Sequence, residues 1–274
     1  MQEKLIKLIC SVEDFEENYM CNCGCCEDIM TEFIDDLNAI FLNVDEVKEI
    51  SSYIKWLNLS VFTDENYKSA YLKDDIRDAI EEVLKSDIEA KKVTFDYDLV
   101  YQYIEFSASL INYLEDISLK QLISLASKNP YVLYLIDDFS IDTLKEITKN
   151  NNGAALIIDV DVLSDEQLYN TYLYKNRDRF LEDKELYDLY INGLKEALKL
   201  DKMKYVSMSK IARNDIYLAK FILNIDPRFI AYTEYNIRNN KDIMLHMLSL
   251  DISNKYYLSE ELKKDIDIQK ILNS

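Results

Sequence analysis

One segment in the C-terminal half of the chain runs Asn214-Asp-Ile-Tyr-Leu-Ala-Lys-Phe-Ile-Leu-Asn-Ile-Asp-Pro-Arg-Phe-Ile-Ala-Tyr-Thr-Glu-Tyr-Asn-Ile-Arg238. Apolar residues recur at helical spacing from Leu218 to Leu223, and this first part ends at Asp226. After Asp226, the apolar spacing from Phe229 to Ile237 is again that of a helix. An apolar face in each part is typical of two short amphipathic helices. The segment therefore predicts a helical hairpin with its corner at Asp226.

The segment is one copy of an internal repeat with a period of 25 residues. Shifting the sequence by this period superposes a leucine and a corner aspartate in three consecutive copies: Leu198, Leu223 and Leu248, and Asp201, Asp226 and Asp251. The copies span residues 189–213, 214–238 and 239–263, and residues 264–274 resemble the first helix of a fourth. A hairpin of this size cannot bury its apolar face alone, so neighbouring copies are expected to stack. We predict that the three leucines form a buried column between them.

Less regular copies precede these three. Asn129-Pro130, Asn150-Asn151 and Lys175-Asn176 occupy the position of the corner in the earlier copies. Two segments, Ser118-x-x-Gln121 and Ser164-x-x-Gln167, have the capping-box spacing that starts a helix. The sequence therefore predicts an α-solenoid of two-helix repeats of about 25 residues over residues 116–274.

Residues 1–115 lack the repeat and are predicted to form an acidic helical N-terminal region. Ile76, Ile80 and Val83 lie on one helical face, and a further helix is expected to begin near Asp96. The segment Val93-Thr-Phe-Asp-Tyr97 alternates as a strand does. The chain has 3 glycines and 2 prolines in 274 residues, which disfavours glycine-loop nucleotide folds and β-sandwiches. The predicted fold class is all-α.

The repeats from about residue 116 to the end resemble the short α-helical hairpin repeats of uncharacterised bacterial, viral and protist proteins. The resemblance rests on Arg213-Asn-Asp215, which opens a helix, and on Ile225-Asp-Pro227 at the corner. It covers a little over half of the chain and implies no catalytic residues. What it implies for function, the binding of another macromolecule, is an analogy at the level of the fold.

Acidic side chains dominate the chain and are concentrated at its N-terminal end. The 32 Lys and Arg against 51 Asp and Glu give a net charge of −19, with −10 in residues 1–50 and +2 in residues 201–274. Such charge repels nucleic acid and membrane lipid and attracts basic protein surfaces, although it also serves solubility alone. We therefore expect a protein partner with a basic surface, and neither direct nucleic-acid nor membrane binding. The expected partner-binding residues are Glu13, Asp14, Glu16, Glu17, Asp35 and Asp36.

Four cysteines form the most unusual local motif, Cys21-Asn-Cys23-Gly-Cys25-Cys26. Thiolates bind soft metals, so Cys21, Cys23, Cys25 and Cys26 could hold Zn(II) or Cu(I), with Cys10 as a further ligand. One short segment seldom wraps four thiolates around a tetrahedral ion, and no second cysteine pair follows. Redox-active thiols and reduced, partly buried thiols are the competing interpretations. We therefore expect no cofactor, with zinc at this motif left as an alternative.

The remaining chemistry-bearing residues have a structural interpretation that we prefer. The single histidine, His246, falls at a repeat position that holds Glu196 and Phe221 in the preceding copies, which indicates a surface or groove-lining side chain rather than a catalytic base. Three Asp-x-Asp pairs occur, at Asp96/Asp98, Asp159/Asp161 and Asp265/Asp267. The pair at Asp159 follows an apolar run, as the metal-binding pair of nucleotide-sugar transferases does. A chain with 51 carboxylates forms such pairs easily, so this motif is weak.

No segment has the length and apolarity of a membrane span or the pattern of a secretory signal, so we expect a cytoplasmic protein of a bacterial host, encoded by the host or a phage. The predicted function is that of a non-enzymatic protein-binding module. Its most specific form is an acidic inhibitor that blocks a basic, nucleic-acid-binding protein, as a phage anti-defence (anti-CRISPR) protein or the immunity partner of a toxin does. The alternatives are a metal- or thiol-dependent enzyme centred on Cys21–Cys26 and a self-assembling scaffold.

Overall fold

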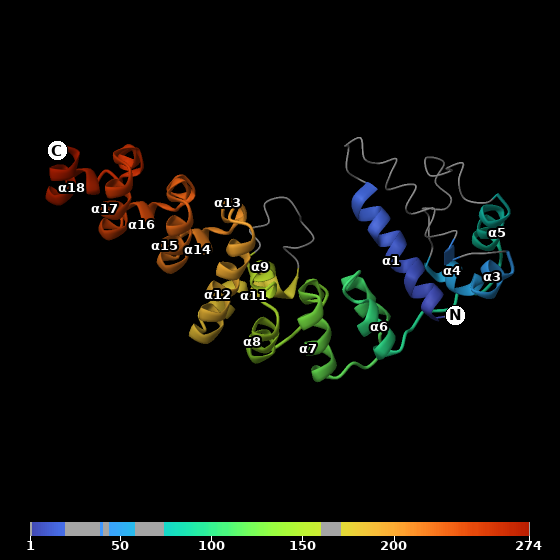
Figure 1. Cartoon of the computed structure of the whole chain (residues 1–274). Helices are drawn as coiled ribbons and strands as arrows, with labels where there is room; N and C mark the ends of the chain where they lie inside the picture. Colours follow the sequence, from blue (N-terminus) through green and yellow to red (C-terminus); the bar gives the residue numbers. More distant parts are fainter. Residues whose placement is uncertain (1, 20–38, 41–43, 58–73, 160–170, 274) are drawn as a thin grey trace. The chain divides into compact units, whose positions relative to one another are not determined.

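The computed structural model describes residues 2–19, 39–40, 44–57, 74–159 and 171–273 (Figure 1). The fold is all-α, as predicted, and these ranges contain α-helices and 3-10 helices but no strand. The chain divides into two compact units, Met1–Leu125 (unit 1) and Ala126–Ser274 (unit 2). The division falls inside helix α7 (Leu119–Lys128) rather than between residues 115 and 116.

Unit 1 consists of short amphipathic helices around a small apolar core. In chain order they are α1 (Gln2–Tyr19), α3 (Val44–Glu49), α4 (Ser51–Leu57), α5 (Asp74–Lys85), α6 (Tyr97–Tyr103), the 3-10 helix η3 (Ala108–Tyr113) and the beginning of α7. Helices α3 and α4 pack against α5, whose Ile76, Ile80 and Val83 are buried on one face, as predicted. The helix expected near Asp96 is α6, and Asp96 is its N-cap residue.

The segment Val93–Tyr97 is not a strand, although its side chains alternate in the predicted way. Val93 and Phe95 are buried, whereas Asp96 is exposed. The Phe95 N–H donates to the carbonyl oxygen of Tyr113 at 2.9 Å. Tyr113 is the last residue of η3, so its backbone cannot continue the pairing along the segment. The alternation therefore reflects an extended connection packed against the core.

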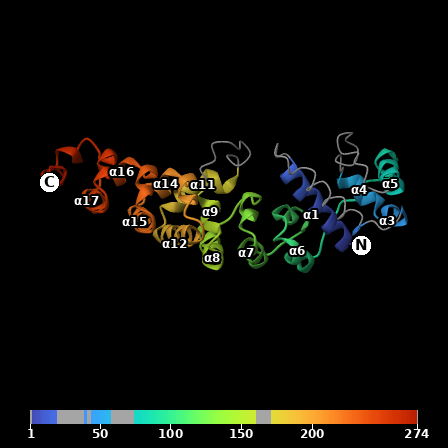
Figure 2. The same ribbon diagram turned by 45° about the horizontal axis from the view of Figure 1, so that its top comes forward.

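Unit 2 consists of paired helical elements that follow one another along the chain. After α7 they are η4 (Pro130–Tyr134), α8 (Ile141–Asn150), α9 (Ala154–Ile158), α11 (Tyr172–Leu181), α12 (Lys184–Leu200), α13 (Lys204–Ser207), α14 (Lys210–Arg213), α15 (Ile216–Ile225), η5 (Pro227–Tyr232), α16 (Tyr235–Arg238), α17 (Lys241–Leu250), η6 (Ile252–Tyr257), η7 (Leu262–Lys264) and α18 (Ile266–Leu272). Figure 2 shows α12, α15 and α17 along one side of this unit, and α14 and α16 along the other.

The corners of the repeats share one local structure, built by an Asx residue. These residues are Asn129, Asn151, Asp201, Asp226 and Asp251, and each has an extended backbone. In each, a side-chain oxygen accepts the N–H of the residue two positions later, at 2.7–3.1 Å. The side chain thus caps the next short helix while its backbone ends the previous element. The predicted corners at Asn129, Asn151 and the three aspartates are confirmed.

The first helices α12 and α15 of unit 2 run in the same direction. Tyr187, near the start of α12, donates to Asp215, the N-cap of α15, at 2.8 Å. Lys202, just after α12, pairs with Asp226, just after α15, at 2.8 Å. The N-terminal ends of α12 and α15 therefore lie side by side, and so do their C-terminal ends. This parallel arrangement is compatible with the predicted α-solenoid. The leucine column is buried as predicted, with exposed fractions of 1% for Leu198, 2% for Leu223 and 4% for Leu248.

Three expectations about the repeat are wrong in detail. Asn176 is no corner: it lies inside α11, where its side chain donates to the Tyr172 carbonyl at 2.9 Å. Helix α12 begins at Lys184, so the boundary expected at residue 189 falls within it. The second half of each copy is also not one helix. It breaks at an extended residue, Met208 in one copy and Thr233 in the next.

Helix α12 approaches α9 closely at Gly193, and this contact yields a stability prediction. A Cβ added at Gly193 would lie 2.5 Å from the Ala155 Cβ and 3.0 Å from the Asn152 carbonyl oxygen. Gly193→Ala is therefore expected to lower the free energy of unfolding by about 1–3 kcal/mol, measured by urea denaturation. Helix propensity alone would raise it by up to about 1 kcal/mol, so a more stable variant would contradict the prediction. Asn192→Ala, at the exposed neighbouring position, is the control.

Candidate functional site

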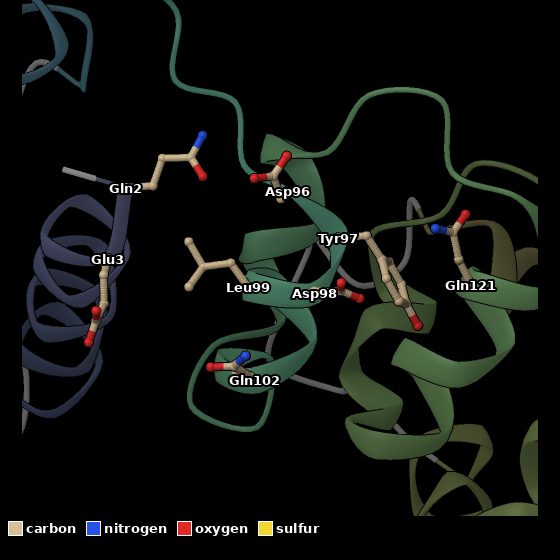
Figure 3. A pocket seen from close by; sticks show the side chains of 8 residues that line it. All are labelled: Gln2, Glu3, Asp96, Tyr97, Asp98, Leu99, Gln102 and Gln121. Carbon is tan, nitrogen blue, oxygen red and sulfur yellow. The ribbon is translucent and has the colours of Figure 1, made fainter.

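A shallow hollow surrounds the N-terminal end of α6 in unit 1, with a volume of about 750 Å³. Eight residues line it: Gln2, Glu3, Asp96, Tyr97, Asp98, Leu99, Gln102 and Gln121. Figure 3 shows Gln2 and Glu3 on α1 opposite Leu99 on α6, with Tyr97 and Gln121 on the other side of α6. The lining thus includes three carboxylates and three amide groups, which makes it polar and acidic.

Two hydrogen bonds hold α1 beside the segment that leads into α6 and beside α6 itself. The Gln2 amide donates to the Thr94 carbonyl oxygen, and the Tyr103 hydroxyl donates to Glu3, each at 3.4 Å. Glu3 also pairs with Lys7 at 2.9 Å, and the hydrogen bond from Lys7 lowers the pKa of the Glu3 carboxyl. The Glu3 carboxylate, which lines the hollow, is therefore ionised and already paired with a cation, Lys7.

The carboxylates of Asp96 and Asp98 have no such cation beside them among the described residues. Both residues are exposed, and no cation of the described residues lies within ion-pair distance of either. Asp96 is the N-cap of α6, yet its side chain makes no capping hydrogen bond, unlike Asp183 or Asp215. The positive end of the α6 backbone stabilises the two ionised side chains. The hollow therefore presents two unneutralised carboxylates to solvent.

The sequence motif Asp-x-Asp marked this pair, but nothing in the sequence distinguished it from the other two pairs. Asp265 caps α18 through the N–H groups of Asp267 and Ile268, and both aspartates bind Lys241 at 2.7–2.9 Å. That pair is structural. The contact of α1 with α6, which turns Asp96/Asp98 into part of a hollow, joins residues far apart in the sequence.

The side chains of all six predicted partner-binding residues lie outside the described residues. Glu13, Asp14, Glu16 and Glu17 belong to the C-terminal half of α1, but their side chains lie outside the described residues. Asp35 and Asp36 also lie outside the described residues. The assignment of these six residues to a partner stays a prediction.

The predicted metal site stays a prediction for the same reason, because Cys21, Cys23, Cys25 and Cys26 lie outside the described residues. Within the ranges that the structure describes, no group of three or more His, Cys, Asp or Glu side chains could hold a metal ion. His246 is exposed on α17, as predicted.

A second cluster of polar side chains is buried in unit 2, around Asp159. This carboxylate follows α9 and is 4% exposed. It accepts a hydrogen bond from the hydroxyl of Tyr190 on α12. It also accepts two hydrogen bonds from Ser209, one from the hydroxyl at 2.6 Å and one from the N–H at 3.1 Å. Burial raises the pKa of the Asp159 carboxyl, although its three donors favour the charged form.

The contacts of the Asp159 carboxylate are those of a structural cluster. Each oxygen of the carboxylate is occupied by a donor of the protein itself. Its donors come from α12 and from the N-cap of α14, so the carboxylate ties α9 to two later elements. Asp161 lies outside the described residues, so the pairing of the two aspartates stays untested.

Helix α18 differs from the first helices that precede it. The buried positions Ala219 of α15 and Met244 of α17 correspond to Gln269, which is exposed. Leu223 and Leu248 correspond to Asn273, whose amide donates to Gln269 at 3.2 Å. End-to-end stacking of copies through α18 would bury these amides where the other copies bury apolar groups. These two amides stand where the preceding first helices bury apolar groups.

Comparison of the chain with protein-family models, with curated proteins and with solved structures finds no match. No helix in the described part of the chain is both long and apolar enough to cross a membrane.

Proposed function

We propose that the chain is a protein-binding module whose acidic unit 1 occupies a basic surface of a partner protein. Unit 1 carries 11 basic and 27 acidic residues, a net charge of −16, whereas unit 2 carries 21 and 24, a net charge of −3. Charge of this size attracts a basic partner over a distance set by the salt concentration, about 8 Å at physiological ionic strength. The unequal distribution favours unit 1 as the part that meets the partner.

The observation that carries the proposal is the pair Asp96 and Asp98 in the hollow at α6. Their carboxylates are exposed, close in sequence and without a cation among the described residues. Arginine and lysine side chains of a partner supply that cation, and the glutamines of the rim supply further hydrogen-bond acceptors. The volume of about 750 Å³ admits the side chains of a short basic segment.

The most specific form of the proposal is an inhibitor of a nucleic-acid-binding protein. Such proteins hold phosphates with arranged lysines and arginines. An acidic protein surface competes for the same cations, which suits an anti-defence protein of a phage or the immunity partner of a toxin. The acidic residues predicted from the sequence, Glu13 to Glu17, follow the hollow-lining residues along the same helix, α1.

A binding measurement with two matched variants tests the role of the hollow. We expect Asp96→Asn/Asp98→Asn to weaken binding of a fluorescent arginine-rich peptide about five- to thirtyfold, because two ion pairs of roughly 0.5–1 kcal/mol each are lost. The control is Asp87→Asn/Glu89→Gln, which changes the net charge equally at exposed residues outside the hollow. Fluorescence anisotropy at low and physiological salt measures both. Equal losses in the two variants would show that net charge alone matters.

Displacement by nucleic acid tests the inhibitor form. The partner is captured on the immobilised full chain from the native host and identified by mass spectrometry. Added double-stranded DNA or RNA should release the partner, because the nucleic acid and the chain compete for the same cations on the partner. A captured partner with an acidic surface, or one that nucleic acid does not release, would count against this form while leaving the peptide result intact.

A further inference from the structure

Unit 2 has a pocket of about 380 Å³ where the segment that leads into α8 meets α11. It plays no part in the proposed function, because the hollow at α6 belongs to unit 1. On α11, Arg179 and Phe180 follow Tyr172 by seven and eight residues, which places the three on one face of the helix. From the segment before α8 and its first residue, the lining includes Asp138, Phe139 and Ile141. Two parts of the chain thus supply aromatic and charged side chains to one pocket.

Three aromatic rings of the lining pack against one another. The ring centroid of Phe139 lies 5.1 Å from that of Tyr172 and 5.8 Å from that of Phe180. The centroids of Tyr172 and Phe180 are 6.1 Å apart. Phe139 and Phe180 are buried, and Tyr172 is half-buried. The packed rings fix one another in place and offer an aromatic surface on which a further ring can pack, edge to face or offset.

Two exposed side chains of opposite charge, Asp138 and Arg179, also line the pocket. The Arg179 guanidinium lies over the Phe180 ring, 5.3 Å from its centroid. Among the described residues, no ion pair joins Asp138 and Arg179 to each other or to a third residue. The pocket therefore presents one anion and one cation that the described residues do not neutralise.

The charged residues beside the pocket do not add a second cation to it. Asp142 lies 3.8 Å from Lys145, and Asp178 pairs with Arg177 at 3.2 Å. The acidic residue at position 137 is exposed but lies outside the lining. A purely anionic ligand would gain one guanidinium and face a carboxylate, and a purely cationic ligand would face the reverse. The surroundings therefore favour a ligand that carries both charges.

We propose that this pocket binds a free aromatic amino acid. The carboxylate of the ligand pairs with the Arg179 guanidinium, whose parallel N–H groups match the two oxygens of a carboxylate. The ammonium group of the ligand pairs with the Asp138 carboxylate. The ring of the ligand packs on the aromatic cluster formed by Phe139, Tyr172 and Phe180.

The size and chemistry of the pocket select against other ligands. Its volume is near the lower end of the roughly 300–1,000 Å³ of small-molecule pockets, which suits a single amino acid better than a dinucleotide. A nucleotide would bring several negative charges to Asp138. An aliphatic amino acid would pair with both charged side chains but gain less from the three rings.

Titration of the full chain with L-phenylalanine, L-tyrosine and L-tryptophan, followed by saturation-transfer NMR of the ligand, tests the proposal. We expect saturable binding of at least one of the three. Derivatives of the tightest ligand then test each contact: the N-acetyl form lacks the ammonium group, and the amide lacks the carboxylate. Each derivative should bind about fivefold less tightly or worse, and so should L-alanine, which lacks the ring.

Two variants assign the contacts to their residues. Arg179→Gln and Asp138→Asn should each weaken binding of the amino acid about fivefold or more. In Arg179→Gln the amino acid and its amide should bind with similar affinity, because the group that distinguishes them is gone. The matched controls, Lys175→Gln and Asp137→Asn, remove the same charges at exposed neighbouring positions outside the lining and should change binding less than about twofold.

Three outcomes would overturn the proposal. The first is that none of the three amino acids binds in a saturable way. The second is that the N-acetyl form or the amide binds as tightly as the amino acid, because these forms mimic the C-terminal and N-terminal residues of a polypeptide. The third is that the control variants lose as much affinity as Arg179→Gln and Asp138→Asn. None of these results bears on the proposed function, whose test uses basic peptides and residues of unit 1.

Discussion

Replacing Asp159 with alanine is expected to lower the free energy of unfolding by about 3–5 kcal/mol, because it leaves three buried donors without an acceptor. These are the hydroxyl of Tyr190 and the hydroxyl and N–H of Ser209. Tyr190 is fully buried and Ser209 is 1% exposed, so water cannot replace the lost partner without opening the structure. Urea denaturation followed by circular dichroism measures the loss. Asp188→Ala, at an exposed position of α12, is the control.

A double-mutant cycle separates the hydrogen bond from the general cost of truncation. Tyr190→Phe alone should cost about 1–2 kcal/mol, because it removes one donor and leaves Asp159 with two. In the Asp159→Ala background the same change should cost much less, since the tyrosine hydroxyl then has no partner to lose. Additive losses in the double variant, or a loss for Asp159→Ala no larger than that for Asp188→Ala, would show that the buried cluster does not tie these elements together.

The features of the fold that could be predicted from the sequence are those set by neighbouring residues. The corner at Asp226 needs only its own side chain and the N–H of Arg228, so the same residue type at the same repeat position produces the same turn. The capping box at Ser118 is equally local. The Ser118 N–H donates to the Gln121 side chain at 2.9 Å, and the Gln121 N–H donates to the Ser118 hydroxyl at 3.3 Å.

The features that sequence reasoning missed depend on contacts between distant residues. Asn176 has the spacing of a corner, but it lies within α11, whose N-cap is Thr171 and which continues through Asn176 to Leu181. The hollow in unit 1 exists because α1 lies beside α6, through contacts such as Tyr103 with Glu3. Asp159 was noticed as part of a motif, yet its actual partners, Tyr190 and Ser209, lie on later elements of the chain. Local patterns could not indicate any of these pairings.

Truncation of the buried leucine column is the most direct test of the repeat itself. Leu223→Ala should lower the free energy of unfolding by about 2–5 kcal/mol, because it removes buried apolar surface and leaves a cavity. Leu223 is 2% exposed on α15, which lies between α12 and α17 along unit 2 (Figure 2). In stacked repeats the stability is close to a sum over copies and their interfaces, so damage to an inner copy uncouples both neighbours.

Leu248→Ala, one copy nearer to α18, should cost less than Leu223→Ala. Leu248 is buried to a similar extent, at 4% exposed, but α17 is followed by α18, which offers Gln269 and Asn273 in place of apolar groups. The change should therefore loosen the last elements of unit 2 and leave α12 and α15 folded, which hydrogen exchange can locate. Leu200→Ala makes the same chemical change at a position that is 89% exposed, and it should alter stability by less than about 0.5 kcal/mol. Equal losses at Leu223 and Leu200 would mean that the column does not hold the copies together. Burial alone places both column leucines above Leu200, whereas a larger loss at Leu223 than at Leu248 is what stacking on two neighbours adds.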